Sequence, residues 1–158
     1  MKTHHYSSHL VWDGNLGDGT SSYASYGRQY RVLVEGKAEL QGSANPMFRG
    51  DAGLHDPEDF FLASISSCHM LSYLALCARE KISVVAYEDA AEGTLLLEGG
   101  GGRFTEVVLH PAVTIAKGDV ERAHALHEKA HLLCFIASSC SVPIRHEATV
   151  TVASVMAK

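Results

Sequence analysis

One long apolar segment dominates the pattern of hydrophobic and polar positions, and it predicts a helix over residues 56–81. Asp56 can cap this helix, Pro57 suits its first position, and Glu58 and Asp59 favour the positive end of the helix dipole. Apolar side chains then occupy nearly every side, which is typical of a helix buried all round. A chain of 158 residues can hardly cover such a helix alone, so the pattern also suggests a partner subunit.

Strand-like segments flank this helix on both sides. They cover residues 4–12, 26–34, 38–40, 84–98, 103–116 and 147–155. Gly99–Gly102 reads as the hairpin between the fourth and fifth of them, and a second helix begins at Asp119 and ends near Cys134. The order β-β-β-α-β-β-α-β predicts an α+β fold with an antiparallel sheet. Neither a repeat nor a linker is visible, so we expect one domain over residues 1–158.

Composition narrows the classes of function. Apolar residues make up 46% and charged residues 20%, and the net charge is −5 without any basic stripe, which argues against a nucleic-acid partner. No apolar run reaches the roughly 20 residues of a membrane span, and Met1–Tyr6 carries no apolar signal core. We therefore expect a cytoplasmic chain without a membrane partner. Its four cysteines should be reduced at rest and serve as core thiols, metal ligands or redox centres.

The cysteines differ in their predicted surroundings. Cys68 lies in the middle of the first helix, and Cys77, nine residues later at about 100° per residue, faces the opposite side and should belong to the core. Cys134 ends the second helix, and Cys140 follows six residues later. Either of these could resolve an oxidised Cys68, or both could be buried thiols. His69 points about 100° away from Cys68, which favours a core or interface position.

A short metal-site pattern offers a competing interpretation. His127 and His131 enclose Glu128 in an H-E-x-x-H pattern, in which two His could share a zinc ion and the Glu could act as a base. His124 lies on the adjoining face. The pattern is short for a chain with ten His, and no downstream Gly-and-His extension follows. We therefore interpret it as a polar helix face and expect no metal.

The two cysteine segments together resemble the OsmC/Ohr family of hydroperoxide reductases, in its OsmC-like branch. Residues 56–63 read Asp-Pro-Glu-Asp-Phe-Phe-Leu-Ala and lead to Cys68, ten residues after Glu58. Residues 130–138 place Cys134 three residues after a His, and it is followed by Phe where the family usually has Pro. The resemblance implies the OsmC-like fold, in which an antiparallel sheet wraps around a long central helix of an intertwined dimer.

The same resemblance implies a set of roles. Cys68 would be the peroxidatic cysteine and Cys134 the resolving one, in a thiol peroxidase of the oxidative stress response that reduces organic hydroperoxides, uses a dithiol reductant and needs no cofactor. Family members also use an Arg to activate the first cysteine and a Glu to hold that Arg. Glu58 matches the Glu directly. Arg28 is the best match for the Arg, and Arg49 is the runner-up.

Elementary chemistry makes that Arg necessary. A thiol with a pKa of about 8.5 is only about 3% ionised at pH 7, and a position three turns into a helix gains little from the helix dipole. Glu58 is separated from Cys68 by ten residues, or about 15 Å of helical rise. It can reach Cys68 only if two central helices lie antiparallel, so we expect a homodimer with composite sites. The alternative is a non-catalytic stress protein that binds a small apolar ligand.

Overall fold

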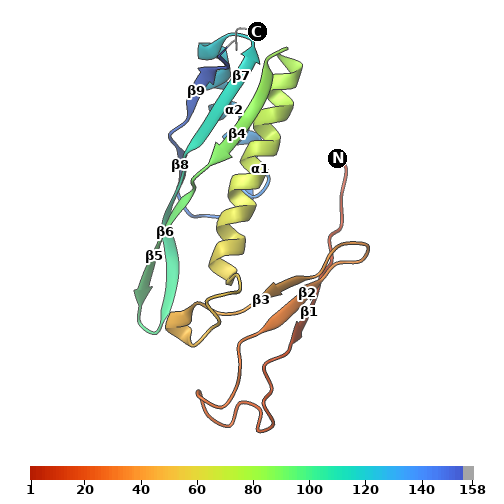
Figure 1. Cartoon of the computed structure of the whole chain (residues 1–158), viewed down its shortest axis with the longest axis vertical. Coiled ribbons are helices and arrows are strands. Elements are labelled where there is room, and N and C mark those ends of the chain that lie inside the picture. Colours follow the sequence, from red (N-terminus) through yellow and green to blue (C-terminus); the bar gives the residue numbers. More distant parts are fainter. Residues whose placement is uncertain (155–158) are drawn as a thin grey trace. The chain divides into compact units, whose positions relative to one another are not determined.

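The computed structural model describes residues 1–154, and the chain forms two compact units, Met1–Phe60 and a larger unit that begins at Phe61. In chain order the elements are β1 (His9–Trp12), β2 (Tyr30–Leu33), β3 (Leu40–Gly42), η1 (Pro46–Phe48), α1 (Pro57–Arg79), β4 (Ser83–Asp89), β5 (Glu92–Glu98), β6 (Gly101–Leu109), β7 (Pro111–Lys117), α2 (Val120–Leu133), η2 (Ala137–Ser139), β8 (Ile144–His146) and β9 (Thr149–Val152). Figure 1 shows these elements along the chain. The predicted α+β class is confirmed.

The first unit is built on the antiparallel sheet β1-β2-β3. The long loop between β1 and β2 is closed by the indole of Trp12, which donates to the Gly27 carbonyl at 2.9 Å, and by an ion pair of 2.6 Å between Arg31 and Asp13. The strands β1 and β2 are shorter than predicted, because the predicted segments included loop residues next to them. Strand β3 has the predicted length but lies two residues further along the chain than expected.

Asp56 starts α1 as predicted. Its carboxylate accepts a hydrogen bond from the Asp59 backbone at 2.9 Å, and the Asn45 amide group donates to the same carboxylate at 3.1 Å. Asn45 itself accepts from the Met47 backbone, so the loop and the helix start are tied together. The helix ends at Arg79, two residues before the predicted end, because Lys81 adopts a left-handed backbone with φ of 60°.

The second unit contains two three-stranded sheets, with the strand orders β4-β7-β9 and β5-β6-β8. The β4–β7 and β5–β6 pairs are antiparallel, as predicted, but β9 pairs with β7 and β8 pairs with β6 in parallel. The sheets are therefore mixed rather than purely antiparallel. The last strand was predicted to reach residue 155. It ends at Val152, and Val155 lies outside the described residues.

Both predicted long strands are broken at their middles, and one side chain explains the breaks. Asp89 ends β4, and its carboxylate accepts a hydrogen bond of 2.7 Å from the backbone of His110, which lies between β6 and β7. The hydroxyl of Ser66 on α1 donates to the same carboxylate. A side chain thus replaces a sheet hydrogen bond at the point where both strands pass from one sheet to the other.

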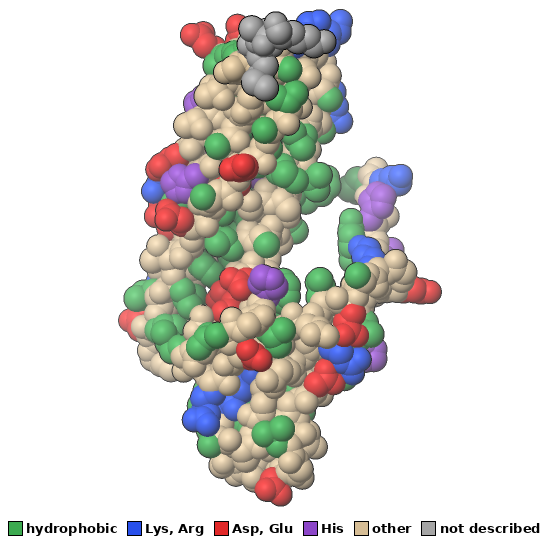
Figure 2. All heavy atoms as spheres, viewed as in Figure 1, with side chains coloured by type: hydrophobic (Ala, Val, Ile, Leu, Met, Phe, Trp, Pro, Cys, Tyr) green, Lys and Arg blue, Asp and Glu red, His purple; other side chains and the backbone are tan. Residues whose placement is uncertain are grey.

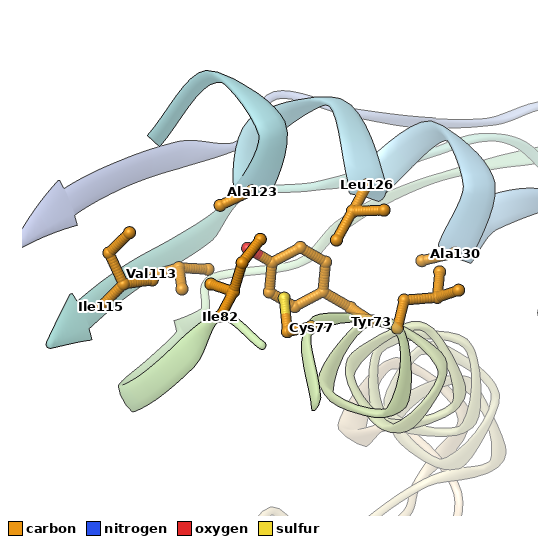
Figure 3. Packing of buried hydrophobic residues seen from close by; sticks show 9 residues of the cluster. Tyr73, Cys77, Ile82, Val113, Ile115, Ala123, Leu126 and Ala130 are labelled. Atoms are coloured by element: carbon orange, nitrogen blue, oxygen red, sulfur yellow. The ribbon is translucent and has the colours of Figure 1, made fainter. Parts of the chain in front are cut away.

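The larger of two core clusters in the second unit lies between α1, α2 and the sheet β4-β7-β9. Tyr73 and Cys77 extend from α1 towards Ile115 of β7 and Leu126 of α2, and all four side chains are 1% exposed or less (Figure 3). Gly118 joins β7 to α2 with φ of 127°, a backbone conformation that a residue with a side chain rarely adopts. This core covers only one side of α1, because Leu71 on another side is 63% exposed.

The surface agrees with some sequence expectations and corrects one. Lys and Arg side chains are scattered over the face shown in Figure 2 and form no stripe there. The expectation that no apolar segment is long enough to span a membrane is wrong, because α1 is long and apolar enough by length and composition. Its buried side packs against α2 and the sheet β4-β7-β9.

Candidate redox site

The peroxidatic candidate, Cys68, lies at the midpoint of α1 and is half-buried. Ser67, the preceding residue, is exposed, and its hydroxyl donates to the Ala63 carbonyl at 2.7 Å. His69, the following residue, points elsewhere and is 1% exposed. Cys77 is 1% exposed in the core. The prediction that Cys68 and Cys77 face different sides of the helix is therefore confirmed, and so is the core position of His69.

Cys134 caps the C-terminus of α2 and is 1% exposed. Its sulfur accepts a hydrogen bond of 3.4 Å from the Ala137 backbone, because the chain turns back into η2 immediately afterwards. Burial raises the pKa of the Cys134 thiol to about 11, and the neighbouring Cys68 thiol adds to the rise. The structure therefore brings Cys68 and Cys134 together, although 66 residues separate them in the chain.

A groove of about 640 Å³ opens beside this pair. Its walls come from successive turns of α1 and from the segment around the end of α2. The lining residues are Ser64, Ser67, Cys68, Leu71, Ser72, Ala75, Leu76, Arg79, Leu133, Phe135 and Ile136. Phe135 is 80% exposed and Leu133 45% exposed, so the groove is bordered by apolar side chains that water reaches. Such a surface suits an apolar ligand or an apolar partner surface.

Sequence reasoning found only part of this lining. Among the apolar residues Phe60, Phe61, Met70 and Leu71 of α1, only Leu71 lines the groove. Phe61 instead stacks on Phe104 with ring centroids 5.0 Å apart. Arg79 and Phe135 were missed. The spacing Ser64, Cys68, Leu71, Ala75, Arg79 marks one face of the helix and could have identified the α1 wall.

The other candidate residues belong to the first unit. The guanidinium of Arg28 lies over the rings of Tyr26 and Tyr23, 3.9 Å and 4.5 Å from their centroids, and it donates to both backbone carbonyls. Arg49 follows η1 with a left-handed φ of 65°. Glu58 occupies the first turn of α1 and is half-buried. The roles predicted for these three residues at Cys68 stay predictions.

A comparison with protein-family models matches residues 50–148 to the family described as OsmC-like protein. The chain belongs to the OsmC-like family. The match begins before α1 and includes both cysteine segments. A search of the curated proteins found no match. The resemblance inferred from the two cysteine motifs is thus confirmed.

Solved structures of OsmC-like proteins share the fold of this chain. An OsmC-like protein of unknown function from Vibrio cholerae is 28% identical, with a TM-score of 0.83 over 93% of this chain and 100% of that one. An organic hydroperoxide resistance protein from Elizabethkingia anophelis is 24% identical, with a TM-score of 0.66 over 97% and 100% of the two chains. The organic hydroperoxide resistance protein OhrB of Bacillus subtilis is 17% identical, with a TM-score of 0.60 over 91% and 98%.

This OsmC-like chain also buries a pair of histidines that the motifs did not predict. His127 is fully buried, so the prediction that its helix face is polar is wrong at this position. Its Nδ1 atom lies 3.0 Å from Nε2 of His69, and the ring of Tyr73 stacks on it. His131 is half-buried, near His146. Among residues 1–154 no group of three His, Cys, Asp or Glu side chains is arranged to hold a metal ion.

Proposed function

We propose that this OsmC-like chain is a thiol-dependent peroxidase that reduces organic hydroperoxides to alcohols. The observation that carries the proposal is the proximity of the Cys68 and Cys134 thiols beside an apolar groove. Two neighbouring thiols can form a disulfide, and the groove can hold the apolar part of a hydroperoxide. Proteins with this fold that are named organic hydroperoxide resistance proteins support the same proposal.

The reaction uses the two cysteines in turn. The Cys68 thiolate attacks the terminal peroxide oxygen, the O–O bond breaks, and the alkoxide takes a proton and leaves as the alcohol. Cys68 is then a sulfenic acid. The Cys134 sulfur attacks Cys68, a disulfide forms, and water leaves. A dithiol reductant returns both cysteines to thiols by exchange and is itself oxidised to a disulfide.

Cys68 needs a cation to favour its thiolate form, and we propose Arg28 for this role, with Arg49 as the alternative. The two tyrosine rings and two carbonyls hold the Arg28 guanidinium in one place, which reduces the entropy lost when it engages a thiolate. We propose that Glu58 positions this Arg.

The proposal includes a homodimer. Glu58 and Cys68 are about 15 Å apart along the same helix, so Glu58 serves the Cys68 site of a second subunit. Two antiparallel α1 helices would then cross near Ala63, midway between the two positions. Ala63 is small and exposed, which permits close approach of two helices. The second copy would also cover the exposed Leu71 and Phe135 beside the groove.

A non-catalytic role is the second candidate, and the groove itself favours it. About 640 Å³ with mostly apolar walls can hold a small apolar ligand without any reaction. This candidate predicts that the protein binds such a ligand and that Cys68→Ser leaves the binding unchanged.

The test is peroxide consumption with dithiothreitol as reductant, measured for wild type, Cys68→Ser, Cys134→Ser and the core control Cys77→Ser. We expect wild type and Cys77→Ser to turn over cumene hydroperoxide, Cys68→Ser to be inactive, and Cys134→Ser to form no disulfide. We also expect cumene hydroperoxide to be used more efficiently than hydrogen peroxide, because of the apolar groove. A folded wild type that consumes no peroxide would contradict the proposal and favour ligand binding.

A further inference from the structure

Cys140 lies outside the proposed mechanism, yet it opens onto a cavity of its own. It follows η2 directly and is half-buried, whereas Cys134 on the other side of η2 is 1% exposed. The cavity has a volume of about 420 Å³ and shares no lining residue with the groove at Cys68. It is lined by Phe61, Arg103, Phe104, Thr105, Cys140, Ser141, Val142 and Pro143. The lining residues thus include one Arg, two residues with hydroxyl groups and Cys140.

The sulfurs of Cys134 and Cys140 both form hydrogen bonds with the backbone of Ala137. The Ala137 backbone N–H donates to the Cys134 sulfur at 3.4 Å, and the Cys140 thiol donates to the Ala137 carbonyl at 3.6 Å. The segment between them contains the single 3-10 turn η2, in which Ser138 and Ser139 are exposed. Both sulfurs therefore lie within hydrogen-bonding distance of the same residue, Ala137. Backbone hydrogen bonds from Ser138 to Cys134 and from Ser139 to Ile136 hold this turn, so a bond between the two sulfurs requires η2 to rearrange.

A third thiol matters because an external reductant must reach one sulfur of the disulfide. Exchange with an external thiol requires that one sulfur of a disulfide can be attacked from solution. In a Cys68–Cys134 disulfide, Cys134 is fully buried, and Cys68 lies in a groove that the proposed second subunit borders. Cys140, in contrast, is reached from the separate cavity, where the Arg103 cation can attract an anionic thiol reductant.

Building on the proposed peroxidase function, we propose that Cys140 takes over the disulfide and is the point at which the reductant acts. The Cys140 thiolate attacks the Cys134 sulfur, the Cys68–Cys134 bond breaks, and Cys68 leaves as a thiolate ready for the next peroxide. A dithiol then attacks Cys140 in the cavity, and the Cys134–Cys140 bond breaks. The dithiol closes to its own disulfide, and both cysteines are thiols again.

Tryptic peptides distinguish the two disulfides. Residues 130–145 lie between cleavage sites and contain both Cys134 and Cys140, whereas Cys68 lies in the peptide of residues 50–79. The protein is treated with one equivalent of cumene hydroperoxide, or separately with the thiol oxidant diamide, then alkylated and digested. In wild type we expect peptide 130–145 to lack two hydrogens while Cys68 is alkylated. In Cys140→Ser we expect a cross-link between peptides 50–79 and 130–145.

The variant should also recover more slowly. We expect the Cys68 thiol of oxidised Cys140→Ser to return at least about tenfold more slowly in dithiothreitol than that of wild type. The control Cys77→Ser removes a core thiol outside the proposed relay and should recover like wild type. A wild-type cross-link at Cys68–Cys134 with unchanged recovery in Cys140→Ser would overturn the relay, as would a Cys68–Cys140 cross-link in Cys134→Ala. If only diamide oxidises the protein, a Cys134–Cys140 disulfide supports the relay while the peroxidase proposal fails.

Discussion

The buried pair of His69 and His127 is an unusual feature for a protein core. One ring nitrogen of each faces the other at 3.0 Å, whereas His69 Nδ1 and His127 Nε2 have no hydrogen-bond partner within residues 1–154. Burial lowers the pKa of His69 to about 4, with further lowering by His146 and His131 against an opposing effect of Asp89. Burial lowers the pKa of His127 to about 3, helped by His69, His146 and His124. Both rings are therefore neutral at pH 7.

This pair predicts loss of stability in acid. Above a pH of about 6.5 both rings are mostly neutral in the folded and in the unfolded state. Between a pH of about 6.5 and 4 the two rings bind protons in the unfolded state but stay neutral in the folded state. The free energy of unfolding should therefore fall as the pH falls, by at most about 1.4 kcal/mol per pH unit for each ring. Urea unfolding from pH 7 to pH 4 measures this slope.

The matched variants are His69→Leu/His127→Leu, which removes the pair, and His5→Gln, which alters an exposed His in the first unit. The double variant should lose much of the pH dependence of the unfolding midpoint, whereas His5→Gln should keep it. An unchanged slope in the double variant would show that the acid sensitivity has another origin.

Among the elements, α2 carries Cys134, and a side chain fixes its start. The carboxylate of Asp119 accepts a hydrogen bond of 2.6 Å from the Arg122 backbone. Asp119→Ala should lower the free energy of unfolding by about 1 kcal/mol, because the backbone N–H of Arg122 at the helix start loses its hydrogen-bond acceptor. Urea unfolding measures the change, and Asp18→Ala, in an exposed loop, is the control and should differ little from wild type. Equal midpoints for the two variants would contradict this account of the cap.

Local signals made the helices predictable and left the strand ends unpredicted. Asp56 and Asp119 mark helix starts in the sequence because each side chain bonds a backbone N–H three residues later. The breaks in the two long strands depend on Asp89 reaching His110, 21 residues away, which no local pattern reveals. Strand β8 has only three residues and pairs in parallel with β6, so it shows no alternation of its own.

The candidate site was predictable to a similar extent. The motif spacing pointed to Cys68 and Cys134, and the structure brings these two thiols together. Phe135 and Ile136 of the groove could not be inferred, because their placement follows from the turn into η2 after Cys134. The burial of His127 against Tyr73 likewise depends on how α2 packs on α1.

At the scale of the whole molecule, the proposed dimer depends on Ala63, where the two α1 helices are proposed to cross. A Trp side chain at Ala63 would hold two α1 helices apart at their crossing point, so Ala63→Trp should sediment as a monomer and lose peroxide turnover. The control Ala153→Trp alters a half-buried small residue after β9, remote in sequence from α1, and should remain a dimer. Circular dichroism checks that both variants fold. A wild type that sediments as a monomer at micromolar concentration would contradict the dimer.

The central claim is that Cys68 accepts the peroxide oxygen, and trapping its sulfenic acid tests this most directly. Cys134→Ser cannot form the Cys68–Cys134 disulfide, so one equivalent of cumene hydroperoxide followed by dimedone should label Cys68, seen by mass spectrometry in the peptide of residues 50–79. Fragment ions distinguish Cys68 from Cys77. The account predicts near-stoichiometric label on Cys68 and none on Cys77, whereas unlabelled protein with the peroxide left intact would contradict it.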